Sequence, residues 1–134
     1  MKVVVDTNVL VSGVFFGGNP ARVLEAWRDD LVQLVVSAEI LEEYRRVGER
    51  LASQHEGVAL GPFLALLATH AEIVEPVSLP KQISRDPADD AFIACAVSGR
   101  CRYIISGDND LLEVGSYRKV KIVSPREFLD ATSG

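Results

Sequence analysis

Short runs of consecutive hydrophobic residues alternate along the chain with segments in which hydrophobic residues recur every three or four positions. The uninterrupted runs are typical of strands that are buried on both faces of a parallel sheet. We expect such strands at residues 3–5, 32–36, 72–75, 103–105 and 120–123. The periodic segments predict helices at about 20–28, 38–51, 63–67, 87–97, 109–112 and from 125 onward, with 9–16 a short helix or a loop. This alternation predicts an α/β fold with helices packed on a central parallel sheet.

Four of the predicted helices begin with a local capping signal. Ser37 precedes the helix at 38–51, and the other three starts place a proline at the first helical position behind a capping residue: Asn19-Pro20, Asp86-Pro87 and Ser124-Pro125. Glu127 follows Ser124 at the spacing of a capping box. These signals fix where the helices begin better than the hydrophobic period does.

Length and composition predict one domain over residues 1–134, since 134 residues with 48% hydrophobic content are enough for one core. The net charge of −5 excludes a broad basic surface, but clustered acids that bind a metal ion would contribute to it, so a nucleic-acid substrate is not excluded. Two cysteines and two histidines without metal-ligand spacing argue against a disulfide framework or a zinc site. The apolar run at the N-terminus is too short for a signal peptide or a membrane span, and we expect a cytoplasmic protein without membrane contact.

Carboxylates stand where two predicted strands end. Asp6 follows the strand at 3–5, and Asp108 follows the strand at 103–105 after Ser106 and Gly107. In an open parallel α/β sheet, ligands bind in the crevice beyond the carboxyl ends of the strands. Asp6 and Asp108 are therefore candidate site residues, and Asp110 is a weaker one.

Two helices supply further acids, and helical phase distinguishes them. At about 100° per residue, Glu43 borders the apolar stripe of its helix, whereas Glu42 points nearly opposite. Asp90 heads the stripe formed by Ile93, Ala94 and Val97, so we expect Asp90 to face the protein interior. Asp86 and Asp89 stand at capping positions of the same helix.

Four carboxylates brought together from different elements repel one another unless they are protonated or neutralised by a cation. Oxygen ligands without histidine or cysteine suit Mg²⁺ or Mn²⁺, which serve phosphate chemistry. Phosphodiester hydrolysis therefore fits, whereas a glycosidase needs only two carboxylates and no metal ion. The sequence lacks a glycine-rich phosphate loop and a serine–histidine triad, which argues against a P-loop nucleotidase and a serine hydrolase.

Four segments carry a resemblance that spans nearly the whole chain: VVVDTNVL, SAEILEEY, DPADDAFIACA and YIISGDNDLL. In this order and spacing they resemble the PIN-domain ribonucleases, particularly those that act as toxins of toxin–antitoxin pairs. The resemblance implies a three-layer α/β/α PIN-like fold with a central parallel sheet, and a quartet of acids that binds Mg²⁺ or Mn²⁺ and cleaves RNA. The matching positions are Asp6, Glu43, Asp90 with Asp89 as a close rival, and Asp108, supported by Asn8 and Ser106.

The resemblance also implies partners. We expect an RNA substrate, a cognate antitoxin protein, and a homodimer that pairs the apolar helix around residues 63–67, although that helix is equally interpretable as core. Two other functions stay open: a PIN-like module that binds RNA or protein without useful cleavage, and a metal-dependent phosphatase for small molecules. The intact acid quartet argues against the binding module.

Overall fold

A twisted six-stranded sheet forms the centre of the computed structural model, which describes residues 1–133. The strands are β1 (Lys2–Val5), β2 (Gln33–Val36), β3 (Glu72–Ile73), β4 (Tyr103–Ile105), β5 (Ser116–Tyr117) and β6 (Val120–Val123), in the order β3-β2-β1-β4-β6-β5. Every pairing is parallel except that of β5 with β6. The predicted α/β class with a mostly parallel sheet is confirmed, and the short antiparallel β5 is an addition that no hydrophobic run indicated.

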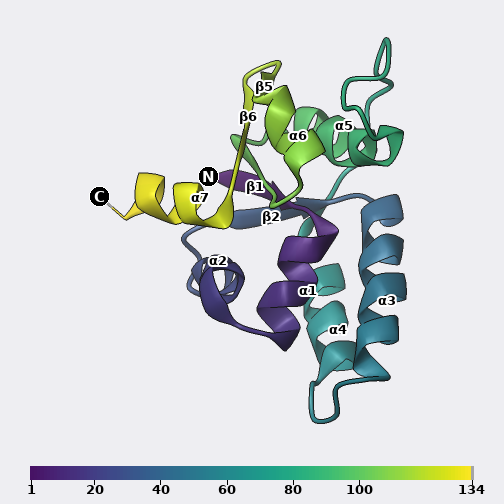
Figure 1. The fold of residues 1–134 in the computed structure, drawn as a ribbon, viewed down its shortest axis with the longest axis vertical. Coiled ribbons are helices and arrows are strands. Elements are labelled where there is room, and N and C mark those ends of the chain that lie inside the picture. Colours follow the sequence, from purple (N-terminus) through teal and green to yellow (C-terminus); the bar gives the residue numbers. More distant parts are fainter. Residues whose placement is uncertain (134) are drawn as a thin grey trace.

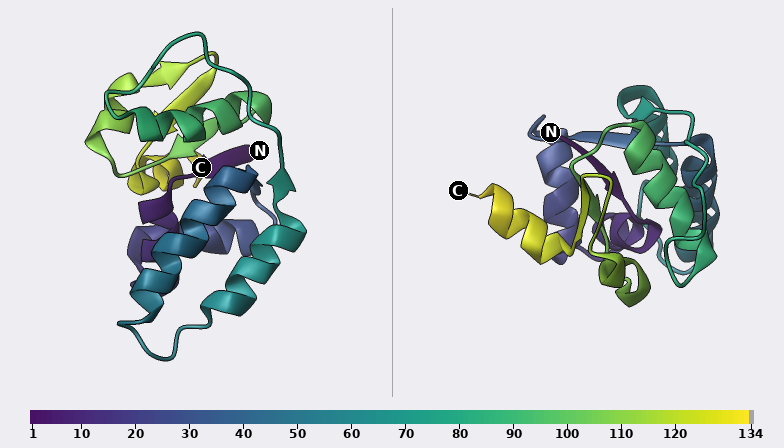
Figure 2. Two further views of the ribbon diagram at one scale, coloured as in Figure 1. Left: turned by 90° about the vertical axis from the view of Figure 1, so that its right-hand side faces the viewer. Right: turned by 90° about the horizontal axis from the view of Figure 1, so that it is seen from above.

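Helices cover both faces of this sheet. They are α1 (Thr7–Phe15), α2 (Gly18–Arg28), α3 (Ala38–Ala52), α4 (Leu60–His70), the 3₁₀ turn η1 (Pro87–Asp89), α5 (Asp90–Ser98), α6 (Asn109–Val114) and α7 (Pro125–Thr132). Figure 1 shows α5 and α6 on one side of the sheet and α1, α2 and α7 on the other, and Figure 2 shows α3 and α4 running side by side. The three layers enclose a core in which Val3, Val4 and Ile104 have no exposed surface.

The capping signals identify most helix starts correctly. The Ser37 hydroxyl accepts a hydrogen bond from the Ile40 amide at 3.2 Å, and Ser124 and Glu127 form the predicted capping box. The start predicted at Asn19-Pro20 is wrong, because α2 begins at Gly18 behind Gly17 and has no side-chain cap. Both glycines have positive φ angles, which turn the chain early, and proline is tolerated in the first helical turn.

The path of the chain through the sheet determines where a ligand can bind. From β1 the chain moves outward to β2 and β3, then returns to β4 and β6 on the other side of β1. The strand order therefore reverses between β1 and β4, and a crevice at the carboxyl ends of two such strands is the usual ligand site of an open α/β sheet. Asp6 follows β1 at this point, and Ser106 follows β4.

The helices over residues 1–133 all fall short of the length and apolar content that a membrane crossing requires.

Candidate active site

Asp6 is the buried centre of the site. It ends β1 and caps α1, and one carboxylate oxygen accepts a hydrogen bond from the Val9 amide at 2.9 Å. The other oxygen accepts a hydrogen bond from the Ser106 hydroxyl. Burial raises the pKa of Asp6, and the charge of Asp108 raises it further, although hydrogen bonds from Ser106 and Val9 oppose this rise.

Ser106 joins the ends of the two strands. Its fully buried hydroxyl donates a hydrogen bond to Asp6, directly after β1, and accepts one from the Asp108 amide at 3.0 Å. Asp108 in turn caps α6, because its carboxylate accepts a hydrogen bond from the Asp110 amide at 2.9 Å. One serine therefore fixes the Asp6 carboxylate and the main chain that carries Asp108.

Asp89 is the third carboxylate that the structure brings to this point. Its side chain is buried and accepts a hydrogen bond from the Ser84 hydroxyl at 3.2 Å. Its pKa is raised to about 6, first by burial, then by the charge of Asp108, and also by a hydrogen bond between the two carboxyl groups. The charge of Asp108 therefore acts on both Asp6 and Asp89.

Asp90 has a different surrounding, and the prediction that it faces the acid site is wrong. Its two carboxylate oxygens accept hydrogen bonds from the backbone amides of Ser84 at 2.8 Å and Ile83 at 3.0 Å. It also lines a separate cavity of about 560 Å³ with Glu39 and Lys81. Asp90 therefore anchors the loop that precedes η1.

Helical phase does not select Asp90, because α5 is buried on nearly every side. Five consecutive residues, Phe92–Ala96, are buried, so the helix has no single apolar stripe whose direction selects one aspartate. The turn before α5 is also 3₁₀, with about 120° between residues instead of 100°. Asp89, the rival candidate, is the residue that meets Asp108.

Glu43 borders the site through its neighbour Tyr44. The Tyr44 hydroxyl, which is buried, donates a hydrogen bond to the Val5 carbonyl, directly before Asp6. Burial raises the pKa of Tyr44 well above its usual value, and the charges of Asp6 and Glu43 add to this rise. Glu43 is half-buried, whereas the exposed Glu42 pairs with Arg45 on the outside of α3. No pattern in the sequence indicates that Tyr44 ties α3 to the end of β1.

The side chains after Asp6 differ from expectation. Asn8 is exposed and has no side-chain hydrogen bond within residues 1–133, so it supports no carboxylate in this structure. Thr7 is buried instead, and its hydroxyl oxygen has no hydrogen-bond partner in the described part of the chain. Thr7 directly follows Asp6 in the sequence.

The donor chemistry of the site suits a hard divalent cation. The groups are all oxygen donors, and the charge of Asp108 raises the pKa of Asp6 and Asp89, a cost that a cation would relieve. Over residues 1–133, however, no three acidic, histidine or cysteine side chains are placed to hold one ion together. Binding by three ligands at once therefore needs a side-chain rotation, which is easier for the half-buried Asp108 and Glu43 than for the buried Asp6.

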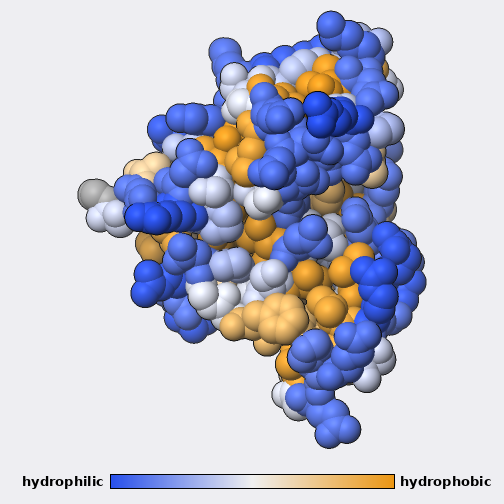
Figure 3. Space-filling model, viewed as in Figure 1, coloured by the Kyte–Doolittle hydropathy of each residue, from blue (hydrophilic) through white to orange (hydrophobic). Residues whose placement is uncertain are grey.

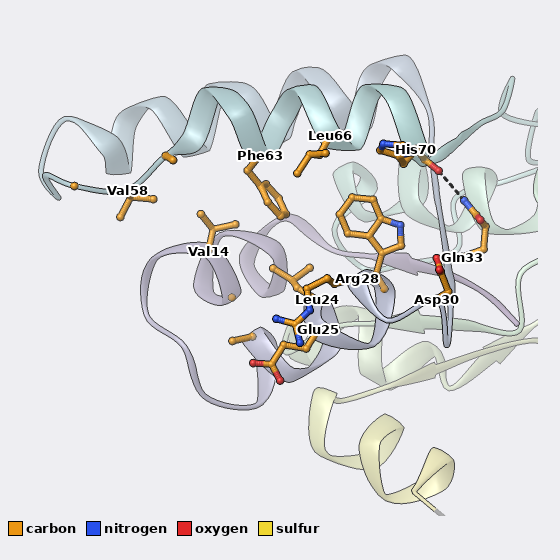
Figure 4. A pocket seen from close by; sticks show the side chains of 15 residues that line it. Val14, Leu24, Glu25, Arg28, Asp30, Gln33, Val58, Phe63, Leu66 and His70 are labelled. Atoms are coloured by element: carbon orange, nitrogen blue, oxygen red, sulfur yellow. Dashed lines mark hydrogen bonds between the residues drawn. The ribbon is translucent and has the colours of Figure 1, made fainter.

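A second concave feature lies away from the acids. A groove of about 930 Å³ between α2 and α4 is lined by Trp27 and Phe63, and Figure 4 shows Phe63 pointing into it from α4. The rings of Trp27 and Phe63 meet edge to face with centroids 6.2 Å apart, and Leu66 beside them is 50% exposed. At its end, the Gln33 amide donates to the His70 carbonyl at 3.0 Å. Figure 3 shows a further hydrophobic area over α1. The residue that follows this helix, Phe16, is exposed.

The sequence was compared with known protein families and with curated proteins. A family model described as PIN domain matches residues 2–110, a range that includes Asp6, Glu43, Asp89, Asp90 and Asp108. No curated protein matches the chain.

Proposed function

Because the chain belongs to the PIN domain family and has its nuclease-type fold, we propose that it is an endoribonuclease that hydrolyses RNA phosphodiester bonds with Mg²⁺ or Mn²⁺. The observation that carries this proposal is the convergence of Asp6, Asp89 and Asp108 at the switch point of the sheet. Buried carboxylates whose pKa is raised by desolvation and by a neighbouring acid, as those of Asp6 and Asp89 are, are typical of a functional site rather than of a stabilising cluster.

Asp6, Asp89 and Asp108 would hold the cation, with Glu43 at the margin of the site. Bound there, Mg²⁺ or Mn²⁺ supplies a water of lowered pKa and stabilises negative charge on the phosphate. The protein contributes orientation, since Ser106 and the Val9 amide fix the Asp6 carboxylate and Ser106 also positions Asp108. Asp89, with a pKa of about 6, loses its proton at neutral pH, the form that binds a cation.

A nuclease assay on mixed cellular RNA tests this proposal. We expect cleavage with Mg²⁺ or Mn²⁺ and none in EDTA. Asp6→Asn should abolish cleavage, and Asp130→Asn, which removes an exposed acid on α7, is the matched control. RNA that is bound but never cut would support the binding-module alternative, and hydrolysis of a small phosphate monoester without RNA cleavage would support a phosphatase.

We also propose that the nuclease is the toxin of a toxin–antitoxin pair, restrained by a small partner protein. The groove between α2 and α4 supports this proposal, because its aromatic and aliphatic lining suits an amphipathic helix. A basic side chain of the partner, inserted among the acids, would replace the charge of the cation. A homodimer would use the same exposed face of α4 around Leu66, while Leu67 belongs to the core.

Co-expression with the protein encoded by the neighbouring reading frame tests the restraint. The chain alone should arrest growth, and the partner should restore growth. The partner should also slow hydrogen exchange at the backbone amides around Leu66. Light scattering with and without the partner distinguishes a homodimer from a complex of two different chains. A monomer that is harmless when expressed alone would contradict both proposals.

A further inference from the structure

Four basic residues gather at the amino-terminal end of β4 and β6, and we call them the basic edge: Arg100, Arg102, Arg118 and Lys119. All four are exposed, and none forms an ion pair with an acidic group within residues 1–133. The carbonyl of Arg102 accepts a hydrogen bond from the Lys121 amide, which places Arg102 beside the start of β6. With neighbouring strands about 5 Å apart, the four backbones lie within roughly 10 Å of one another.

Lys121 is next to these residues but is not counted with them. The positive charge of Lys121 helps to lower the pKa of Glu127, after the larger effect of the hydrogen bonds from Ser124. Lys121 therefore already interacts with an acidic side chain.

The backbone of the basic edge is strained at three of its four positions. Arg100, Arg118 and Lys119 have φ angles of 55°, 45° and 72°, and only one other non-glycine residue of the described chain, Asp30, has a positive φ. Arg118 and Lys119 form the two-residue turn between β5 and β6, where both φ angles are positive. Such turns strongly favour asparagine followed by glycine. Basic side chains therefore occupy positions that their conformation disfavours, and because they are exposed, no burial compensates for the strain.

The side chains of the basic edge are arranged for phosphate rather than for a lipid surface. Two guanidinium groups lie over tyrosine rings, that of Arg102 over Tyr103 at 5.5 Å and that of Arg118 over Tyr117 at 5.2 Å. A guanidinium held in this way presents a planar fork that matches a phosphate group. A lipid surface would need a group of exposed apolar side chains to insert. Among the exposed large hydrophobic residues of the described chain, the one that adjoins the basic edge is Met1, which precedes Lys2, the backbone hydrogen-bond partner of Arg102.

The basic edge is separate from the acid site. Arg102 and Ser106 stand at opposite ends of β4, four residues and thus roughly 13 Å apart. Figure 1 shows the β5–β6 hairpin at the top of the molecule, away from the start of α1 that follows Asp6. RNA that occupies both places must extend over several nucleotides.

We propose that the basic edge binds the phosphate backbone of RNA outside the cleavage site and so makes this acidic protein prefer long RNA. This inference rests on the proposed nuclease function for its ligand class. A net charge of −5 and a cluster of carboxylates repel a polyanion, and a local group of unpaired cations supplies the attraction that the rest of the surface lacks.

The test is RNA binding by fluorescence anisotropy in EDTA, where cleavage is not expected. Arg118→Asn with Lys119→Gly replaces both cations by the residues that the turn favours. It should weaken binding of a single strand of about 20 nucleotides by about tenfold and lower the salt slope by about 1.4, with little effect on a strand of about 5 nucleotides. The melting temperature of this variant should rise, which shows that lost binding is not lost folding.

Arg22→Gln with Arg50→Gln is the matched control, since it removes two exposed cations that have no ion pair within residues 1–133 and lie on α2 and the end of α3. The control should keep the wild-type affinity and salt slope. Unchanged RNA binding in the turn variant, or an equal loss of RNA binding in the control variant, would overturn the proposal. The same proteins are also tested with vesicles that contain phosphatidylserine. A turn variant that loses vesicle binding but keeps RNA binding would overturn the proposal as well. Failure of the nuclease function would appear separately, as wild-type protein that cuts neither RNA when Mg²⁺ is added.

Discussion

Neutralising the neighbours Asp89 and Asp90 should change the stability of the protein in opposite directions. Asp89 is a buried carboxylate beside Asp108, and its ionisation is disfavoured in the folded state. Asp90 accepts hydrogen bonds from two backbone amides, those of Ser84 and Ile83. Asp89→Asn therefore relieves a repulsion, whereas Asp90→Asn removes a favourable acceptor.

The magnitude for Asp89 follows from its pKa, which rises from the ordinary 3.8 to about 6. At about 1.4 kcal/mol per pKa unit, the ionised form costs about 3 kcal/mol of folding free energy, and solvent at the mouth of the site reduces this to roughly 1–2 kcal/mol. Between pH 6 and 3.8 the folded state binds more protons than the unfolded state, so this group makes the wild-type protein more stable as the pH falls. The gain from Asp89→Asn is fully present above pH 6 and disappears as the pH falls toward 3.8.

The magnitude for Asp90 follows from its two hydrogen bonds. An asparagine keeps one acceptor oxygen and loses the negative charge, so one amide loses its partner and the other bond weakens. Hydrogen bonds to charged groups contribute about 1.5–3 kcal/mol each, and we expect Asp90→Asn to destabilise the protein by about 2 kcal/mol at neutral pH.

Urea unfolding of the wild type and both variants, in EDTA at about pH 8 and about pH 4.5, measures these differences. Asp89→Asn should be more stable than the wild type at the higher pH and close to it at the lower one, while Asp90→Asn should be less stable at both. RNA cleavage should be lost in Asp89→Asn and retained in Asp90→Asn. A stability gain in Asp89→Asn that does not depend on pH, or a neutral Asp90→Asn, would refute the reasoning.

Three further predictions concern the remaining acids and the serine between them. Asp6→Asn should abolish RNA cleavage while the free energy of unfolding in EDTA, measured in urea, holds or rises, because burial disfavours its charge. Glu43→Gln should lower Mg²⁺-dependent cleavage far more than Glu42→Gln. Equal cleavage rates in the two variants would show that Glu43 does not contribute to the acid site. Ser106→Ala should cost about 1–2 kcal/mol of stability and raise the Mg²⁺ concentration needed for half-maximal cleavage, because Asp6 loses its hydroxyl donor; an unchanged Mg²⁺ titration would exclude this positioning role.

The sequence alone determined what depends on neighbours along the chain. The continuous valine and isoleucine runs predicted β1 and β4, and Ser37 and Ser124 marked the starts of α3 and α7, because hydrophobic runs and caps act over a few residues. The placement of Asp6 and Asp108 at the ends of parallel strands also followed from the sequence, since parallel strands present their carboxyl ends at one edge.

Only the tertiary structure decided which groups meet across the chain. Asp89 rather than Asp90 reaches Asp108 because the surroundings of α5 leave no single apolar face, a fact about packing that helical periodicity does not contain. The hydrogen bond from Tyr44 to the end of β1 and that from the Lys121 amide of β6 to the Arg102 carbonyl join residues that are not neighbours in sequence. The physical reason is that local patterns fix the direction of a side chain relative to its own element, whereas its partner is fixed by how elements pack.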